Sequence, residues 1–303
     1  MDNRKRFSIQ AVAALLQNAN FKGFFSGKIY SGPLKQICVP GLNCYSCPGA
    51  LGACPLGSLQ NSLSALKFRF PYYVVGMLLF FGAFLGRAVC GFLCPFGWIQ
   101  ELIHRIPFFK RNRFRADRPL RNIKYIILAL LVIILPLTVK LTPFFCKYLC
   151  PAGTSAGILL AVNNTLVSSR LGFLFTWKAV ILGIILVASL IIWRPFCKYL
   201  CPLGAIYGLF NRFSLIRMHI DPERCISCGS CSAACRMNID PVREINHAEC
   251  IRCGDCVRAC PCSALNLGMR QKRTQTDIPR IMRRSLPGDT ASFISEGSHT
   301  EEK

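Results

Sequence analysis

Long apolar segments alternate with short basic segments along this chain. Three of the apolar segments, Pro71–Val89, Ile123–Leu141 and Trp177–Trp193, each approach the roughly 20 residues that an α-helix needs to cross the hydrocarbon core of a bilayer. A fourth segment, Phe7–Phe25, is interrupted by polar residues, and it predicts either a first span or an amphipathic helix on the membrane surface. The pattern therefore predicts three to four transmembrane helices.

Lysine and arginine gather between two of these apolar segments. Eight of them fall between Arg105 and Lys124, and basic loops beside membrane spans usually face the cytoplasm. We therefore expect this loop in the cytoplasm, residues 26–70 and 142–174 at the outer face, and the chain after Trp193 back in the cytoplasm. The formal net charge of +23 would also suit nucleic-acid binding, but basic residues that flank apolar spans favour a membrane protein.

The composition agrees with a membrane protein and adds an unusual number of cysteines. Hydrophobic residues make up 52% of the chain and charged residues 17%, which is too apolar for an ordinary soluble domain. The apolar stretch after the first residues, MDNRKR, is short and no small-residue cleavage site follows it, so we expect no cleaved signal peptide. Nineteen cysteines in a long chain without such a signal indicate metal binding rather than a disulfide scaffold.

Two runs of four cysteines have the C-x2-C-x2-C-x3-C spacing of bacterial two-cluster ferredoxins. In such ferredoxins the fourth cysteine of each run ligates the other cluster. One predicted 4Fe–4S cluster is therefore held by Cys225, Cys228, Cys231 and Cys260, and the second by Cys250, Cys253, Cys256 and Cys235. Structural zinc is the alternative, but zinc sites favour paired knuckles. Cys262 is left over as a packed or exposed free thiol.

An internal repeat brings further cysteines in C-x3-C-P pairs. Residues 87–99 and 194–206 both fit R-x-x-C-x3-C-P-x-G-x-I, residues 145–153 give a third copy without the arginine, and residues 47–59 are a looser relative. Proline is favoured at the first position of a helix, so each pair can stand at a helix start. The two arginine-containing copies predict one more 4Fe–4S cluster at the inner face, with Cys90, Cys94, Cys197 and Cys201 as ligands.

Arg87 and Arg194 precede these two pairs and could offset the charge of a cluster, or could simply anchor the chain at the membrane interface. Six other cysteines would lie near the outer face: Cys38, Cys44, Cys47, Cys54, Cys146 and Cys150. They could hold another cluster, with Cys146 and Cys150 as one half, or form disulfides if that compartment is oxidising. Haem-attachment and dinucleotide-binding motifs are absent.

The stretches CGFLCPFG and CKYLCPLGA, followed by two ferredoxin motifs, resemble the membrane polyferredoxins, a family that includes NapH and NosR. The resemblance covers about residues 5–265. It implies four spans with both termini inside, Phe7–Phe25 being the first, and electron transfer between a quinone pool or cytoplasmic donor and an outer acceptor. The stretches CVPGLNCYSCPGALGACP and FFCKYLCP are additions to the family pattern.

These observations predict an α-helical membrane protein with a C-terminal α+β ferredoxin-like domain. Its expected regions are an N-terminal segment with a cysteine-rich module, a membrane domain, the two-cluster domain and a disordered tail, at residues 1–70, 71–214, 215–270 and 271–303. We expect a multi-pass protein of the cytoplasmic membrane that contacts lipid and redox proteins or quinone, binds no nucleic acid, and serves as an electron-transfer component of an oxidoreductase system. The alternatives are a quinol dehydrogenase subunit whose C-x3-C-P pairs bind no metal, and an iron–sulfur redox sensor or maturation factor.

Overall fold

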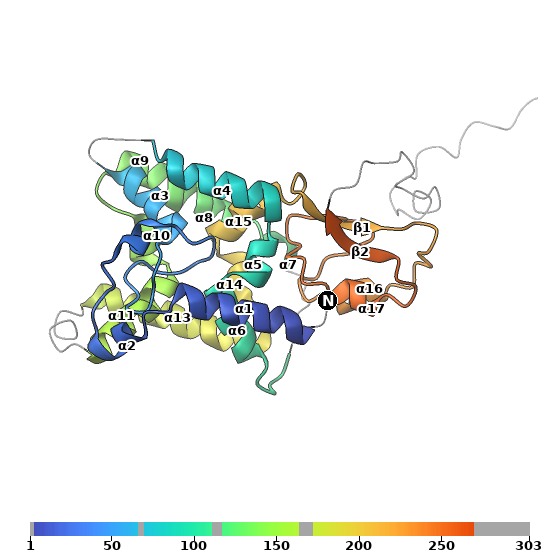
Figure 1. Cartoon of the computed structure of the whole chain (residues 1–303), viewed down its shortest axis with the longest axis horizontal. Coiled ribbons are helices and arrows are strands. Elements are labelled where there is room, and N and C mark those ends of the chain that lie inside the picture. Colours follow the sequence, from blue (N-terminus) through green and yellow to red (C-terminus); the bar gives the residue numbers. More distant parts are fainter. Residues whose placement is uncertain (1–2, 66–69, 111–116, 164–171, 270–303) are drawn as a thin grey trace, which may run out of the picture.

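The computed structural model describes residues 3–65, 70–110, 117–163 and 172–269. The expected disordered tail, 271–303, lies outside the described residues. Most of the chain forms a bundle of helices, and a smaller unit with a two-stranded sheet lies at one end of it (Figure 1). The helices of the bundle are α1 (Asn3–Gln17), α2 (Phe21–Ser26), α3 (Pro55–Ser64), α4 (Tyr72–Leu85), α5 (Ala88–Phe92), α6 (Pro95–His104), α7 (Asp117–Leu120), α8 (Ile123–Ile127), α9 (Leu135–Thr138), α10 (Phe144–Tyr148), α11 (Pro151–Asn163), α13 (Phe173–Ile191), α14 (Pro195–Tyr199) and α15 (Pro202–Phe210), with short helical turns η1 (Pro33–Gln36) and η2 (Leu128–Ile134).

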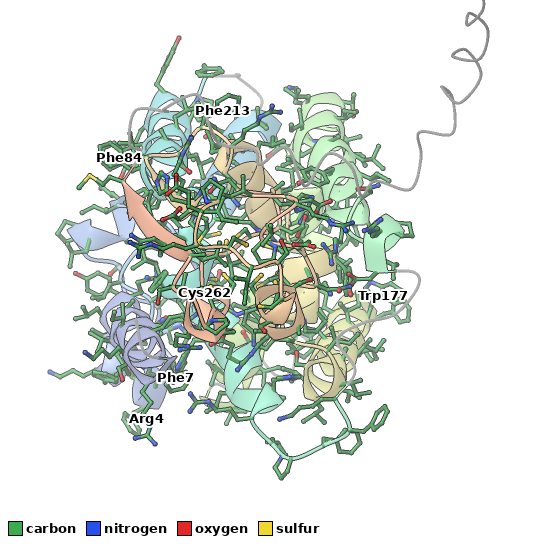
Figure 2. The ribbon with its side chains drawn as sticks, turned by 90° about the vertical axis from the view of Figure 1, so that its right-hand side faces the viewer. Arg4, Phe7, Phe84, Trp177, Phe213 and Cys262 are labelled. Atoms are coloured by element: carbon green, nitrogen blue, oxygen red, sulfur yellow. The ribbon has the colours of Figure 1, made fainter. Side chains whose placement is uncertain are left out.

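Two stretches of the bundle are long and apolar enough to cross a membrane. One is the continuous helix Asp117–Thr138, 22 residues long, which joins α7 to α9, and the other is α13, with 19 residues. Their apolar side chains mostly face outward, as Ile126 at 61% exposure and Ile184 at 63% illustrate. Phe84, Trp177 and Phe213 also lie at the rim of the molecule when it is viewed from the smaller unit (Figure 2). An outer surface of this kind is suited to lipid rather than to water.

The other two expected spans differ from the sequence-based prediction. The segment predicted as Pro71–Val89 forms α4, which ends at Leu85 because Gly86 adopts a positive φ of 52°, a conformation that glycine reaches at little cost. The segment Phe7–Phe25 forms two helices, α1 and α2, and not one. Arg6 and Gln10 of α1 are buried, whereas Val12 and Leu16 are exposed, so this helix packs on the bundle by one face.

Each C-x3-C-P pair is followed by a new helix, as the sequence predicts. Pro55, Pro95, Pro151 and Pro202 begin α3, α6, α11 and α15. The cysteine before the proline caps the helix at Cys54, Cys94 and Cys201. Proline fits there because its fixed φ suits the helix and its missing N–H leaves no bond unmade. These helix starts place the cysteines of distant repeats inside the bundle.

The smaller unit pairs β1 (Ile216–Ile220) with β2 (Leu265–Met269) in antiparallel register, with Met218 opposite Leu267. Two short helices, α16 (Ser230–Ala234) and α17 (Asp255–Ala259), pack against each other beside this sheet. Arg252 fastens the unit to the bundle, because its guanidinium donates to Leu85 O at 2.6 Å and to Asn211 O at 2.9 Å. The Arg252 side chain is buried, so the contact between the smaller unit and the bundle is part of the protein core.

Candidate metal centres

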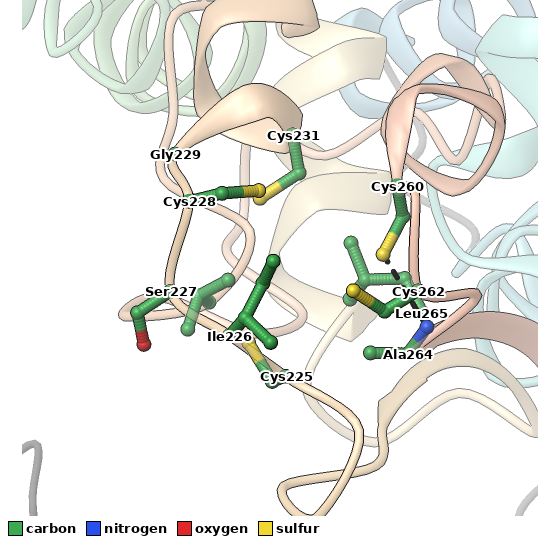
Figure 3. Close-up of a pocket in the computed structure, with 11 residues that line it drawn as sticks. Cys225, Ile226, Ser227, Cys228, Gly229, Cys231, Cys260, Cys262, Ala264 and Leu265 are labelled. Carbon is green, nitrogen blue, oxygen red and sulfur yellow. Dashed lines mark hydrogen bonds between the residues drawn. The ribbon is translucent and has the colours of Figure 1, made fainter.

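Four cysteines predicted to share a cluster line one pocket in the smaller unit. Cys225 and Cys228 lie on the loop that leads into α16, Cys231 lies in the first turn of that helix, and Cys260 reaches the pocket from the end of α17 (Figure 3). Two residues of this loop, Ser227 and Gly229, have positive φ values of 54° and 74°, which curl the backbone around the pocket. The remaining thiol, Cys262, predicted to be packed or exposed, is partly buried and lines the same pocket.

The second ferredoxin-type group forms in the same crossed manner. Burial, together with the neighbouring thiols of Cys250 and Cys235, raises the pKa of the Cys256 thiol to about 12. Cys253 is likewise close to Cys250. Cys235, from the first run, therefore lies with cysteines of the second run, as Cys260 lies with those of the first.

In the helical bundle, Cys90, Cys94, Cys197 and Cys201 form a third group. Burial, together with the nearby thiols of Cys94 and Cys197, raises the pKa of Cys90 to about 12. Cys201 has Cys197, Cys90 and Cys94 as its thiol neighbours. All four are buried, so thiols that lie more than 100 residues apart in sequence share one interior site.

Two arginine side chains lie beside this third group, and each hydrogen-bonds to the other copy of the repeat. Arg87, from the first copy, donates to Cys197 O of the second copy at 2.9 Å, while Arg194, from the second copy, donates to Cys90 O of the first. Both side chains are 0% exposed. The alternative of interfacial anchoring is therefore wrong for these two residues, which lie inside the protein beside the thiols.

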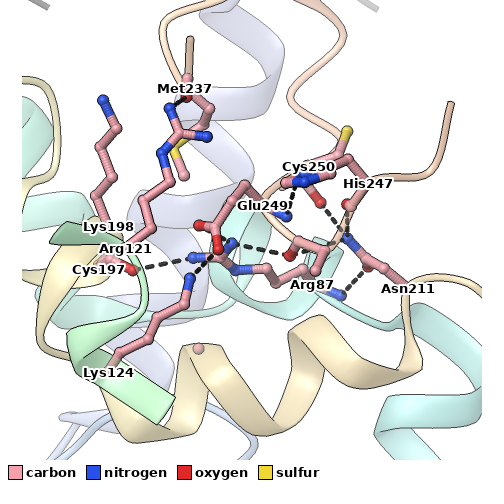
Figure 4. Close-up of polar contacts among 12 residues, drawn as sticks. Arg87, Arg121, Lys124, Cys197, Lys198, Asn211, Met237, His247, Glu249 and Cys250 are labelled. Atoms are coloured by element: carbon pink, nitrogen blue, oxygen red, sulfur yellow. Dashed lines mark hydrogen bonds and ion pairs between the residues drawn. The ribbon is translucent and has the colours of Figure 1, made fainter. Parts of the chain in front are cut away.

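Buried carboxylates balance the arginines. Glu249, which precedes Cys250, accepts from Arg87 at 2.6 Å and also pairs with Lys124 (Figure 4). Burial opposes ionisation of Glu249, but Arg87 and Lys124 outweigh it and lower the pKa of its carboxyl to about 2. Glu101 pairs with Arg6 at 2.9 Å and with Arg194 at 3.1 Å. Each charge is thus paired, as buried charges require.

Sequence reasoning missed Glu101, Glu249 and Gln100. The Gln100 amide donates to Cys197 Sγ at 3.2 Å and its oxygen accepts from Phe196 N at 3.1 Å. A signal for the glutamine existed, because C-P-x-G-x-x-Q occurs after both Cys54 and Cys94. No comparable signal existed for the glutamates, whose partners are remote in sequence.

A fourth group lies at the end of the bundle opposite the smaller unit, near α3 and α10 (Figure 1). Burial, together with the nearby thiols of Cys44 and Cys54, raises the pKa of Cys150 to about 12. Cys146 has Cys150, Cys54 and Cys44 as its thiol neighbours. Cys47 neighbours Cys44 but is not among the thiol neighbours of Cys146 or Cys150, and all nineteen cysteines are free thiols.

The donor sets suit iron–sulfur clusters better than single ions. Within the described residues, no three or more His, Cys, Asp or Glu side chains converge on one metal-ion position. Tetrahedral zinc needs its donors within about 2.3 Å of one ion, whereas a 4Fe–4S cube takes one thiolate on each of its four irons. Groups of four cysteines with a wider spread fit the cube.

Two domain families match the chain. Residues 70–114, 123–166 and 174–221 each match the family described as 4Fe-4S binding domain, and residues 217–261 match the 4Fe-4S dicluster domain. Each of the first three stretches contains one C-x3-C-P pair, so the internal repeat coincides with a repeated domain. No solved structure matches the chain.

Curated relatives are similar over about two thirds of the chain. An uncharacterized protein of Methanocaldococcus jannaschii is 28% identical over 211 residues, which cover 67% of this chain and 72% of that protein. YccM of Escherichia coli, a candidate electron transport protein, is 28% identical over 67% of this chain and 58% of its own length. The methylamine utilization ferredoxin-type protein MauN of Paracoccus denitrificans is 28% identical over 62% of each chain.

Proposed function

The chain belongs to the 4Fe–4S ferredoxin-type proteins of the NapH/NosR type, and on this premise we propose that it carries electrons across a membrane. The donor is a cytoplasmic protein or a quinone, and the acceptor lies at the outer face. The observation that carries this proposal is the third cysteine group, since four buried thiols from two remote repeats meet between the ferredoxin-type unit and the rest of the bundle.

The proposed ligand sets follow the groups described above. Three clusters are held by Cys225, Cys228, Cys231 and Cys260; by Cys250, Cys253, Cys256 and Cys235; and by Cys90, Cys94, Cys197 and Cys201. A 4Fe–4S cluster, when bound, accepts and releases one electron. Cys260 Sγ accepts from Ala264 N at 3.3 Å and Cys201 Sγ accepts from Gly204 N at 3.4 Å, and such N–H donors stabilise negative charge on sulfur.

The contact between the second and third groups supports a path between them. Asn211 donates from its side chain to Cys250 O at 2.7 Å and accepts from Arg87 N at 2.8 Å. Glu249 and Arg87 join the same two regions by an ion pair (Figure 4). One polar network therefore holds the two cysteine groups at a fixed separation, which electron transfer between them needs.

For the membrane topology we propose that Asp117–Thr138 and α13 both cross the bilayer. The basic loop between Arg105 and Lys124 and the ferredoxin-type unit then lie in the cytoplasm, by the positive-inside rule. The exposed apolar faces of both helices support this arrangement. The opposite end of the bundle faces the outer compartment.

Iron analysis tests the third ligand set. The full chain, purified without oxygen, is expected to hold about 8 iron atoms in the ferredoxin-type unit and about 4 more in the third group. Cys94→Ser and Cys201→Ser should each remove the same iron, and the double variant no more, because residues that act as a unit are non-additive. Cys38→Ser is the matched control and should keep all iron.

Three results would contradict this proposal. If both single variants keep the full iron content, the C-x3-C-P pairs bind no metal and the quinol dehydrogenase subunit becomes the better explanation. Stoichiometric zinc in place of iron would refute the ferredoxin-type assignment. Clusters that exchange no electrons with any redox partner would favour a sensor or maturation factor.

A further inference from the structure

The cysteine group near α3 and α10 repeats the construction of the third group. In both, a cysteine before a helix-starting proline stands beside a C-x3-C-P pair from another repeat: Cys54 with Cys146 and Cys150, and Cys94 with Cys197 and Cys201. The glycine two residues after each proline lies within ordinary contact distance of the outer group. A Cβ on Gly57 would lie 3.9 Å from Cys146 Sγ, and one on Gly153 would lie 3.8 Å from Cys44 Sγ.

A buried glutamine lies beside each group. Gln60 accepts from Cys146 N at 3.3 Å, whereas Gln100 accepts from Phe196 N, one position earlier in its motif, at 3.1 Å. Each glutamine lies six residues after the cysteine that caps its own helix, and each is 0% exposed. The Gln60 amide donates to Leu131 O at 3.0 Å and the Gln100 amide to Cys197 Sγ at 3.2 Å, so the two sites share the position of the glutamine and its bond to a backbone N–H, but not the bond to a thiol.

A basic side chain lies at the equivalent position of each site. Lys178 donates to Cys146 O at 3.2 Å, as Arg87 donates to Cys197 O at 2.9 Å. The corresponding glycines confirm the match, since a Cβ on Gly153 would lie 3.7 Å from Lys178 Nζ and one on Gly204 would lie 3.5 Å from Arg87 Nη2. Lys178 belongs to α13, an apolar helix long enough to span a membrane, where a charged residue marks a functional site.

Two of the remaining cysteines have other surroundings. Cys38 Sγ lies 3.6 Å from Ser58 Oγ, and Cys38 sits at the isolated β-bridge with Ala53. Cys47 follows Cys44 in a tight turn, in which Cys47 N donates to Cys44 O at 3.1 Å. Cys146 and Cys150 both have Cys44 and Cys54 as thiol neighbours, whereas Cys47 neighbours Cys44 alone within this set.

We propose that these four cysteines hold a further 4Fe–4S cluster, which gives the bundle two cluster sites built on one plan. This inference rests on the proposed function, because it extends the same electron path. The cluster would stand at the end of the bundle away from the ferredoxin-type unit. A one-electron acceptor protein docking at that end would take electrons from it.

The chain itself links the two bundle sites over a short distance. A Cβ on Gly41 would lie 3.0 Å from Cys94 Cα, and Cys44 follows only three residues later. Three extended residues reach at most about 11 Å. Tyr207, fully buried and donating to Pro40 O at 3.0 Å, lies beside the same strand of chain. The outer cysteines are therefore close neighbours of the third group.

Iron and sulfide analysis of the full chain tests the site. Without oxygen, the unmodified protein should contain about 16 iron atoms, counting four clusters. Cys44→Ser/Cys54→Ser and Cys146→Ser/Cys150→Ser should each lose about 4, and the quadruple variant no more. The control Cys38→Ser/Cys47→Ser should lose none. Unchanged iron in both test variants, or a disulfide among these thiols in a protein with about 12 iron atoms, would overturn the site and leave the proposed function standing.

Lys178→Met provides a readout that does not depend on removing a ligand. Loss of its positive charge disfavours the more negative, reduced cluster, so the midpoint potential of one cluster should fall while the others stay unchanged. Lys147→Met, on an exposed side chain of α10, removes the same charge as a control and should shift none. Equal potentials in Lys178→Met and the unmodified protein would contradict the site. A protein that holds iron at the outer site but none at the third group would instead contradict the proposed function.

Discussion

At the scale of single residues, the thiols are set among opposed charges and hydrogen-bond donors. The buried guanidiniums of Arg87 and Arg194 reach across the repeat to the carbonyls of the opposite cysteine pair. Each arginine is matched by a carboxylate, Glu249 or Glu101. The site therefore offers positive charge to a cluster without burying an unpaired ion, which would be costly.

Gln100 offers a specific test at this scale. Its amide donates to Cys197 Sγ at 3.2 Å, and hydrogen bonds to cluster sulfurs are one lever that sets the potential. Gln100→Leu should lower the midpoint potential of one cluster while the iron content stays at that of the unmodified protein. Redox titration followed by electron paramagnetic resonance measures this. Gln36→Leu, at an exposed position, is the control, and an unchanged potential in Gln100→Leu would show that this bond does not act on a cluster.

The eight ferredoxin-type cysteines could be found from spacing alone, and the structure groups them in the same crossed pattern. The choice of Cys44 and Cys54 from six candidates could not be made this way, because no regular spacing distinguishes them from Cys38 and Cys47. Only the folded structure shows that Cys44 and Cys54 are the thiols beside Cys146 and Cys150.

At the scale of elements, the sequence predicts that a helix begins at the proline of each Cys-Pro pair, but it does not predict where α4 ends. Proline at the first helical position has a local cause, so Pro95 and Pro202 could be assigned from sequence. The end of α4 at Gly86 depends on a tertiary neighbour: a Cβ there would lie 2.7 Å from Asn211 Oδ1 and 2.8 Å from Arg252 Nη1. Hydropathy continues past this point, which is why a longer span was expected.

Helix α5 offers a test of how the bundle holds the ferredoxin-type unit. A Cβ on Gly91 would lie 2.6 Å from Ile251 O, a backbone atom between Cys250 and Cys253 that cannot easily move. Gly91→Ala should therefore lower the free energy of unfolding by about 1–3 kcal/mol, the usual cost of overpacking. Denaturant unfolding in detergent measures it.

The matched control is Gly76→Ala in α4, where the added Cβ meets nothing within 4 Å. Alanine is the better helix former, so this variant should be neutral or up to about 1 kcal/mol more stable. If both variants have the same stability, the close contact between α5 and the Cys250 loop is not part of the folded protein.

At the scale of the whole molecule, the ferredoxin-type unit stands at one end of the bundle, and α3 and α10 lie toward the other (Figure 1). Cys54 caps α3 and Cys146 belongs to α10, so the outer group is carried by elements away from the ferredoxin-type unit. The sequence predicted an inner and an outer cysteine site, but not the hydrogen bonds that cross the repeat, because Arg87 and Arg194 reach Cys197 O and Cys90 O from more than 100 residues away. Sequence also could not place α1, since its buried contacts join Arg6 to Glu101 across 95 residues.

The most direct test of the account is electron transfer across a sealed proteoliposome. The protein is inserted with its ferredoxin-type unit outward, a low-potential donor is added outside, and an impermeant one-electron acceptor is enclosed. The unmodified protein should reduce the enclosed acceptor, and Cys146→Ser/Cys150→Ser should abolish this reduction while its ferredoxin-type clusters are still reduced by the donor. If the unmodified protein, with all its iron bound, leaves the enclosed acceptor oxidised, it does not carry electrons across the membrane.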